Sequence, residues 1–194
     1  MNLCELLQAT DGVVLQGDAR TEIRDLCYDS RAVTPGALFV CLPGLHTDGH
    51  NYALQAAAAG AAGIVCERLP DGLPQDLPVV QVTHSRRALA QLAIQLYGAP
   101  ARQMTMIGIT GTKGKTTTAH LIAAVLEAAG RKVGLIGTNG VSWPGYRHPL
   151  QHTTPESCDL QRLLRQMVDA GCDACVMEVS SLGLRMDRVT GIEY

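Results

Sequence analysis

MTMIGITGTKGKTTT, the stretch from Met104 to Thr118, decides the fold of the second half of this chain. Its first six residues are mainly apolar, which predicts a buried strand that ends near Ile109. A glycine-containing loop follows, and a helical pattern begins at Thr116. A strand, a glycine loop and a helix in this order favour phosphate binding, because the loop N–H groups and the positive end of the helix point to one place.

The loop carries the side chains that a nucleotide site needs. Gly111 and Gly114 allow the backbone to curl. Lys115 would reach the β- and γ-phosphates, and the Thr116 hydroxyl would bind Mg²⁺. The loop departs from the strict G-x-x-x-x-G-K-[ST] pattern, because Ile109 stands where the first glycine is expected. We predict binding of a nucleoside triphosphate; the alternative is a glycine-rich turn with a surface lysine.

Length and composition favour an α/β protein of one domain or two small ones. The chain has 194 residues, of which 46% are hydrophobic and 18% charged, as in soluble globular proteins. A net charge of −2 gives no reason to expect nucleic-acid binding, which normally needs a basic face. The first residues show no signal-peptide pattern, and the most apolar window, 53–66, is too short to cross a bilayer. We expect a cytoplasmic protein with no nucleic-acid or membrane partner.

Seven cysteines are scattered through apolar segments, which favours buried reduced thiols. Only Cys172 and Cys175 form a C-x-x-C pair, for which zinc or redox chemistry is the alternative. No second pair of ligands accompanies them, so we favour the structural role.

The first hundred residues alternate strand and helix patterns. Leu3, Leu6 and Leu7 predict a short opening helix. Further elements are predicted from apolar runs bounded by Gly, Pro and Asp: strands at 23–29, 37–42, 63–66 and 79–82, and helices at 51–59 and 85–97. A helix-stopping turn at 98–103 marks the domain boundary. We therefore divide the chain into domains at 1–100 and 101–194.

The second half repeats the alternation. Strands are predicted at 104–109, 132–137 and 173–179, helices at 116–129 and 159–170, and a loop at 138–152. The first two strands and the helix between them form a βαβ unit, so we expect these strands to be parallel neighbours. Three strands and two helices make half of a doubly wound domain at best, which predicts that the chain is a fragment.

Ligands of open α/β sheets bind beyond the carboxyl ends of the strands. Thr138 and Asn139 follow the second strand, and Glu178 ends the third. Glu178 could be an acidic Mg²⁺ ligand or a strand-end carboxylate in solvent, and its position alone favours neither. Thr153-Thr154-Pro155 reads best as a helix N-cap followed by proline.

Six motifs, in matching order along the chain, resemble the signature set of the Mur ligase family. They are Gly108 to Thr118, Thr153-Thr154-Pro155, Met177 to Ser181, Asp29-Ser30-Arg31, Pro35-Gly36 with Leu38-Phe39-Val40, and Asp48-Gly49-His50. Within that family the set is most similar to the members that add the third amino acid of the peptidoglycan stem peptide.

The resemblance implies a small mixed α/β domain that binds the UDP-sugar, followed by the first half of a P-loop ATPase domain with a doubly wound, mostly parallel sheet. It implies an ATP- and Mg²⁺-dependent ligase that joins meso-diaminopimelate or L-lysine to UDP-N-acetylmuramoyl-L-alanyl-D-glutamate through an acyl phosphate, in peptidoglycan synthesis. Lys115 and Glu178 are the implied catalytic residues.

The resemblance also assigns the remaining site residues. ATP would be held by Gly111, Thr112, Lys113, Gly114, Lys115, Thr116 and Thr117, and Mg²⁺ by Thr116 and Glu178. The uridine and pyrophosphate would contact Tyr28, Ser30, Leu45, His46 and Thr47. The muramoyl dipeptide would contact His152, Thr153, Thr154, Ser180, Met186 and Arg188, the last because a guanidinium pairs well with an anion.

The family's carbamylated lysine, a later Mg²⁺-binding histidine and the C-terminal domain that selects the amino acid fall beyond Tyr194, so we expect this chain alone not to turn over. A non-catalytic module that binds a nucleotide or UDP-sugar is the alternative function. An unrelated P-loop NTPase would need a Walker B aspartate or an Asn-Lys-x-Asp motif, and the sequence has neither.

Overall fold

The computed structural model describes residues 1–44 and 47–194. Contacts divide the chain into two compact units, Met1–Leu96 and Tyr97–Tyr194. The predicted boundary at 98–103 lies just after this division, and the assignment of the two halves to UDP-sugar and ATP binding stays a prediction. Among the described residues, no helix has both the length and the apolar character needed to cross a membrane.

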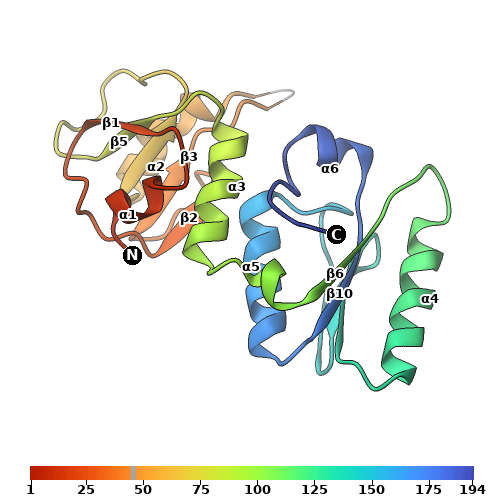
Figure 1. Ribbon diagram of the computed structural model, residues 1–194. Coiled ribbons are helices and arrows are strands. Elements are labelled where there is room, and N and C mark those ends of the chain that lie inside the picture. The colour runs from red at the N-terminus through yellow and green to blue at the C-terminus, as the bar shows by residue number, and fades with distance from the viewer. Residues whose placement is uncertain (45–46) are drawn as a thin grey trace. The chain divides into compact units, whose positions relative to one another are not determined.

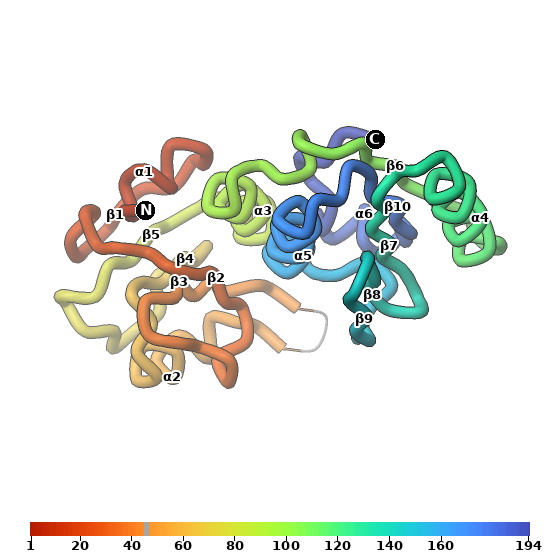
Figure 2. The backbone as a smooth tube through the Cα atoms, turned by 90° about the horizontal axis from the view of Figure 1, so that it is seen from below, coloured from red at the N-terminus to blue at the C-terminus, as the bar shows by residue number. Residues whose placement is uncertain are grey.

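The first unit is built on a five-stranded mixed sheet in the order β1-β5-β4-β3-β2, in which only β1 is antiparallel to its neighbour. The strands are β1 (Val13–Gln16), β2 (Asp25–Cys27), β3 (Ala37–Val40), β4 (Gly63–Cys66) and β5 (Val79–Gln81). The helices are α1 (Leu3–Leu7), η1 (Gly49–Tyr52), α2 (Ala53–Ala58) and α3 (Ser85–Leu96). Figure 2 shows α2 on one side of this sheet and α1 and α3 on the other.

Apolar runs explain why the middle of this sheet is parallel. All residues of β3 and β4 are buried, as expected of parallel strands that are covered on both faces. Phe39 and Ile64 pack with Ala53 and Ala56 of α2 in one core cluster. The predicted strands and helices of this half are confirmed. Strand β1 was not predicted, because its sequence Val-Val-Leu-Gln shows no alternation of apolar and polar residues.

The second unit holds a five-stranded sheet in the order β6-β10-β7-β8-β9 (Figure 2). Its elements are η2 (Pro100–Gln103), β6 (Thr105–Ile109), α4 (Lys115–Ala128), β7 (Val133–Gly137), β8 (Gly140–Trp143), β9 (Tyr146–His148), α5 (Ser157–Asp169), β10 (Ala174–Glu178) and α6 (Ser181–Arg185). Strands β6, β10 and β7 are parallel, whereas β8 and β9 are antiparallel.

Helices α4 and α5 cover opposite faces of this sheet, as Figure 1 shows. Ala174 and Val176 of β10 pack in the cluster that contains Ala119 and Ala123 of α4. The alternate residues, Cys175 and Met177, pack in the cluster of α5. Strand β10 is thus buried on both faces along its whole length.

This burial explains one error of prediction. Strands β6 and β7 are parallel, but they are not neighbours, because β10 lies between them and pairs with both. All five residues of β10 are buried, whereas β6 has exposed and half-buried positions. The strand that is buried at every residue thus has the central place, and β6 lies at the edge.

The segment 138–152 is not the loop that we predicted. It contains the hairpin of β8 and β9, which is closed by Pro144 and Gly145 and pairs Trp143 with Tyr146. The two rings stack with centroids 3.9 Å apart. The Pro-Gly turn between two short segments was the available sequence signal for this hairpin. Helix α6 was also missed, because its one turn is too short to show a period.

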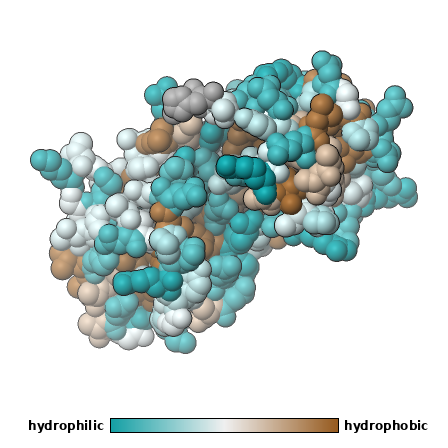
Figure 3. Space-filling view, turned by 180° about the vertical axis from the view of Figure 1, so that it is seen from behind, coloured by the Kyte–Doolittle hydropathy of each residue, from teal (hydrophilic) through white to brown (hydrophobic). Residues whose placement is uncertain are grey.

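The surface mixes polar and apolar side chains. On the face seen in Figure 3, hydrophobic atoms lie between larger hydrophilic areas. Helix α4 contributes two of the exposed apolar side chains, Leu121 (62% exposed) and Val125 (69%), which are one helical turn apart. Their exposure means that only the inner stripe of α4, with Ala119 and Ala123, stabilises the sheet.

Candidate functional site

The predicted phosphate loop joins the end of β6 to the start of α4. Gly111 and Gly114 have positive φ angles of 141° and 80°. A Cβ at Gly114 would meet no atom within 4 Å, so backbone conformation and not space requires glycine there. Gly114 is also the N-cap of α4 and offers no side-chain hydrogen bond. The first N–H groups of α4 therefore lack a side-chain cap, as an anion-binding helix end requires.

The remaining loop side chains are open to solvent or half-buried. Thr112, Lys113 and Thr117 are exposed, and Lys115 and Thr116 are half-buried. The Lys115 ammonium donates to the carbonyl oxygen of Gly111 at 2.8 Å. This bond holds the lysine over the loop, where its charge would meet a bound phosphate.

The Glu178 carboxylate is the centre of the polar cluster at the end of β10. The residue is only 1% exposed and pairs in register with Ile109, the last residue of β6. Its Oε2 accepts a hydrogen bond of 3.0 Å from the Thr116 hydroxyl, and its Oε1 accepts one of 2.9 Å from the Thr138 N–H. The predicted pair Thr116 and Glu178 is therefore in direct contact, and Glu178 is not a solvent-exposed strand end.

Gly137 makes room for this carboxylate. A Cβ at Gly137 would lie 2.8 Å from Cδ and 2.9 Å from Cγ of Glu178 and closer still to Oε1. The last residue of β7 can therefore only be glycine while Glu178 keeps this position. Gly137 was predicted as a strand residue without a role in the site.

The oxygen donors at this position suit Mg²⁺. A hydroxyl and a carboxylate are hard ligands, and Mg²⁺ is usually bound by one or two carboxylates together with substrate phosphates. Within residues 1–44 and 47–194, no group of three or more His, Cys, Asp or Glu side chains could hold a metal ion. A cation held by Thr116 and Glu178 would draw its other ligands from phosphates or water.

The predicted dipeptide contacts fall into two groups. Thr154 is 1% exposed; its hydroxyl lies 3.0 Å from the Glu178 carbonyl oxygen and accepts the Ser180 N–H at 3.0 Å. The Ser180 hydroxyl in turn accepts the Gly183 N–H and caps α6. These two side chains stabilise the fold of the site. Helix α5 has Glu156 as its N-cap, so the predicted capping role of Thr153 and Thr154 is wrong.

Arg188 is also held inside the second unit. Its guanidinium pairs with Glu156 at 2.7 Å and donates to the Thr154 carbonyl oxygen at 3.0 Å. Both charged side chains are only 9% exposed. Arg188 therefore fixes the segment that carries Thr153, which is half-buried, while His152 is exposed and Met186 half-buried.

The residues predicted for the uridine and pyrophosphate lie in the first unit. Ser30 is 9% exposed and donates to the Gln55 side chain at 3.0 Å, Tyr28 is half-buried and Thr47 exposed. Leu45 and His46 lie outside the described residues. The Gly44 N–H donates to the Thr47 carbonyl oxygen at 2.9 Å.

Asp48 and His50 contact the two residues that directly follow β4. The His50 ring contacts Asp48 through Nδ1 and accepts the Glu67 N–H at Nε2, 2.9 Å away. Arg68 pairs with the second oxygen of Asp48 at 2.6 Å. Burial raises the pKa of Asp48, but the hydrogen bonds from His50 and Arg68 outweigh burial and lower this pKa to about 2.

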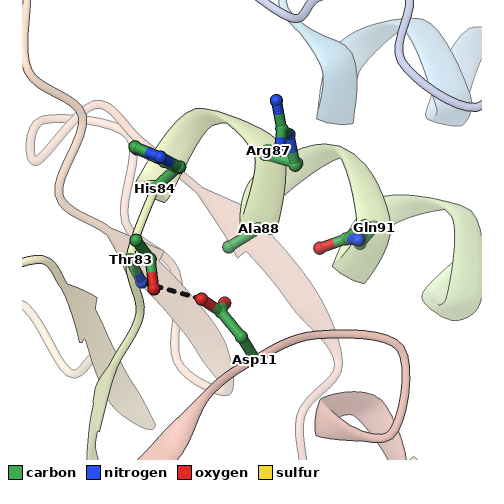
Figure 4. Close-up of a pocket in the computed structure, with 6 residues that line it drawn as sticks. All are labelled: Asp11, Thr83, His84, Arg87, Ala88 and Gln91. Carbon is green, nitrogen blue, oxygen red and sulfur yellow. Dashed lines mark hydrogen bonds between the residues drawn. The ribbon is translucent and has the colours of Figure 1, made fainter.

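A cavity of about 300 Å³ lies in the first unit at the start of α3 (Figure 4). It is lined by Asp11, Thr83, His84, Arg87, Ala88 and Gln91. Hydrogen bonds from Thr83 lower the pKa of Asp11, and Figure 4 shows Asp11 reaching toward Thr83. None of the predicted site residues that the structure describes lines this cavity.

A sheet in which β6, β10 and β7 are parallel, with a glycine loop between β6 and α4 and a buried carboxylate at the end of β10, is typical of P-loop nucleotide-binding domains. Known proteins agree with this class. Residues 109–194 match the Mur ligase middle domain, and residues 22–97 match the Mur ligase family, catalytic domain. The chain belongs to the Mur ligase family.

The relatives extend beyond this chain. UDP-N-acetylmuramoyl-L-alanyl-D-glutamate–2,6-diaminopimelate ligase of Geobacillus thermodenitrificans is 47% identical over 194 residues, which cover all of this chain and 39% of the relative. The chain spans about two fifths of the length of the curated relatives that it matches. We therefore treat the activity of the whole relatives as a proposal for this protein.

Solved structures share the fold. A UDP-N-acetylmuramoyl-L-alanyl-D-glutamate–2,6-diaminopimelate ligase matches with a TM-score of 0.80 at 24% identity, over 98% of this chain and 38% of its own. The MurF ligase of Thermotoga maritima, solved in complex with ADP, matches with a TM-score of 0.57 at 26% identity, over 81% of this chain and 32% of its own.

Proposed function

We propose that the second unit binds ATP together with Mg²⁺. The loop from Gly111 to Thr117 would hold the phosphates, and Thr116 and Glu178 would hold the cation. The observation that carries this proposal is the hydrogen bond of 3.0 Å between Thr116 and the buried carboxylate of Glu178. It brings a loop hydroxyl and a strand-end acid to one point, beside an uncapped helix N-terminus. The ADP complex of the Thermotoga maritima relative supports the choice of an adenine nucleotide.

The wider proposal is an ATP-dependent ligase of peptidoglycan synthesis. It would join an amino acid to UDP-N-acetylmuramoyl-L-alanyl-D-glutamate, and the names of the relatives favour 2,6-diaminopimelate over lysine. Tyr28, Ser30 and the segment 45–47 would contact the UDP part. The muramoyl dipeptide would lie near Thr153, with His152, Thr154, Ser180, Met186 and Arg188 around it. The cytoplasm is the proposed compartment.

The chemistry assigned to these residues is positioning and charge stabilisation. In the proposed reaction the substrate carboxylate attacks the γ-phosphorus of ATP and ADP leaves; the amine of the amino acid then attacks the acyl phosphate and phosphate leaves. Lys115 would stabilise the charge that develops on the transferred phosphoryl group. Mg²⁺, when bound, would offset the negative charge of the phosphates. Glu178 would hold that cation and keep Thr116 oriented.

Nucleotide titration of the chain tests the first proposal. We expect ATP to bind in the presence of Mg²⁺, and Lys115→Met to weaken this binding at least tenfold, or by about 1.4 kcal/mol. Lys132→Met is the matched control, because Lys132 is an exposed lysine before β7 that we expect to leave ATP affinity unchanged. Isothermal titration calorimetry measures both. Equal affinity of the two variants would contradict the assigned role of the loop.

A further inference from the structure

Thr138 links two parts of the site that were predicted separately. It follows Gly137 directly and has no predicted role. Its N–H donates to Glu178 Oε1 at 2.9 Å, and its hydroxyl donates to Oε2 at 3.2 Å. The same hydroxyl oxygen lies 3.1 Å from the hydroxyl oxygen of Thr153. Within the described residues the Glu178 carboxylate accepts three hydrogen bonds. Two come from Thr138, and the third comes from the Thr116 hydroxyl.

The chemistry of these groups fixes the direction of the chain of hydrogen bonds. A carboxylate only accepts, and a hydroxyl has one hydrogen. When Thr138 gives its hydrogen to Glu178, it must accept from Thr153. The chain therefore runs from the Thr153 hydroxyl through Thr138 to Glu178, and such chains strengthen each member.

We propose that Thr138 is a positioning residue, which orients the Glu178 carboxylate for a divalent cation and connects it to Thr153. This inference rests on the proposed function, in which Glu178 holds Mg²⁺ and Thr153 contacts the substrate. The N–H bond fixes one carboxylate oxygen, and the hydroxyl bond fixes the oxygen that also contacts Thr116. Without the hydroxyl, the carboxylate can rotate away from Thr116, and fewer molecules present both oxygen ligands together.

The test compares Thr138→Val with Thr138→Ser. Valine keeps the shape and the N–H but removes the hydroxyl, whereas serine keeps both donors. We measure the fluorescence of an ATP analogue with an N-methylanthraniloyl group while Mg²⁺ is titrated, and separately its affinity with EDTA. We expect Thr138→Val to raise the half-maximal Mg²⁺ concentration about tenfold, Thr138→Ser to leave it within twofold of the unmodified chain, and neither to change the affinity in EDTA.

The link to Thr153 is tested with a double variant. We expect Thr153→Val alone to raise the half-maximal Mg²⁺ concentration about threefold, and to add nothing in the Thr138→Val background, because Thr153 acts through Thr138. Independent additive effects would overturn the connection. Equal shifts for Thr138→Val and Thr138→Ser, or no shift for Thr138→Val, would overturn the positioning role. If the unmodified chain shows no Mg²⁺-dependent binding, the proposed function itself fails and this inference fails with it.

Discussion

The substitution Gly137→Ala probes how tightly the Glu178 carboxylate is held. A Cβ at this position would lie 2.8 Å from Glu178 Cδ, whereas ordinary contact begins at 3.4 Å. The carboxylate would have to withdraw by at least the difference, which stretches the 2.9 Å hydrogen bond from the Thr138 N–H. A hydrogen bond to a charged group contributes about 1.5–3 kcal/mol. We expect Gly137→Ala to lower the free energy of unfolding of the second unit by about 2–3 kcal/mol.

Urea unfolding followed by tryptophan fluorescence measures this loss. Trp143, on β8, is the one tryptophan of the chain, so its emission reports on the second unit. With an m-value of about 1–3 kcal/mol per molar urea, the midpoint should fall by roughly 1–2 M.

A second background isolates the cause of the loss. Glu178→Ala removes Cγ, Cδ and both oxygens, which are the atoms that the new Cβ would meet. In the Glu178→Ala background the new Cβ meets no carboxylate, so Gly137→Ala should cost less than about 0.5 kcal/mol, as substitutions without a clash usually do. An equal cost of Gly137→Ala in both backgrounds would refute the close packing of the carboxylate on this glycine.

Three further predictions concern stability. Because the pKa of Asp48 falls to about 2 from 3.8, its stabilising effect is complete above about pH 4 and is lost as the pH falls toward 2. Asp48→Asn should therefore lower the free energy of unfolding by roughly 2 kcal/mol at pH 7. In urea titrations this difference from the unmodified chain should shrink at pH 2.5, and a difference that stays constant contradicts the prediction. Glu156→Gln removes the charged partner of the buried Arg188 and should lower the free energy of unfolding by about 3 kcal/mol. Asp169→Asn, in the more exposed pair with Arg165, should lower it by less than about 1 kcal/mol. Similar losses for the two variants in urea unfolding would contradict the importance of the buried pair. Leu164→Ala, in the core formed with α5, should lower the free energy of unfolding by about 3 kcal/mol. Leu121 is 62% exposed, so Leu121→Ala should change it by no more than about 0.5 kcal/mol. Thermal unfolding followed by circular dichroism compares the two variants, and equal melting temperatures would contradict the prediction.

Most helices and strands could be predicted because their ends are set by residues close by in the sequence. Strand β4 was predicted at 63–66 and lies at Gly63–Cys66, since a glycine and a turn bound an apolar run. Helix α4 was predicted at 116–129 and lies at Lys115–Ala128. Its ends follow from Gly114 and from Gly130, which has a φ of 82°. Signals of this kind are carried by a few adjacent residues and need no knowledge of the rest of the chain.

Pairing between distant segments could not be predicted in the same way. The hairpin of β8 and β9 has a second strand of only three residues, all on the exposed side, so it shows no alternation of buried and exposed positions. The pair of Glu156 and Arg188 joins residues 32 positions apart, and neither residue alone signals the other. For Thr138, the only signal was its position directly after a strand. This position places the residue at the carboxyl edge of the sheet but does not identify the side chain that it contacts.

Strand order explains why the candidate site could be predicted in its parts but not as a whole. The loop after β6, the Thr138 turn after β7 and Glu178 at the end of β10 meet because β10 lies between β6 and β7. With β6 and β7 as direct neighbours, as we expected, β10 would pair with only one of them, and Glu178 could not contact both Thr116 and Thr138 from a central position. The apolar residues that bury β10 on both faces therefore also place its terminal carboxylate between the two loops. The residues that stabilise the sheet thus determine the geometry of the site, at the point where the order of strands departs from the order of the chain.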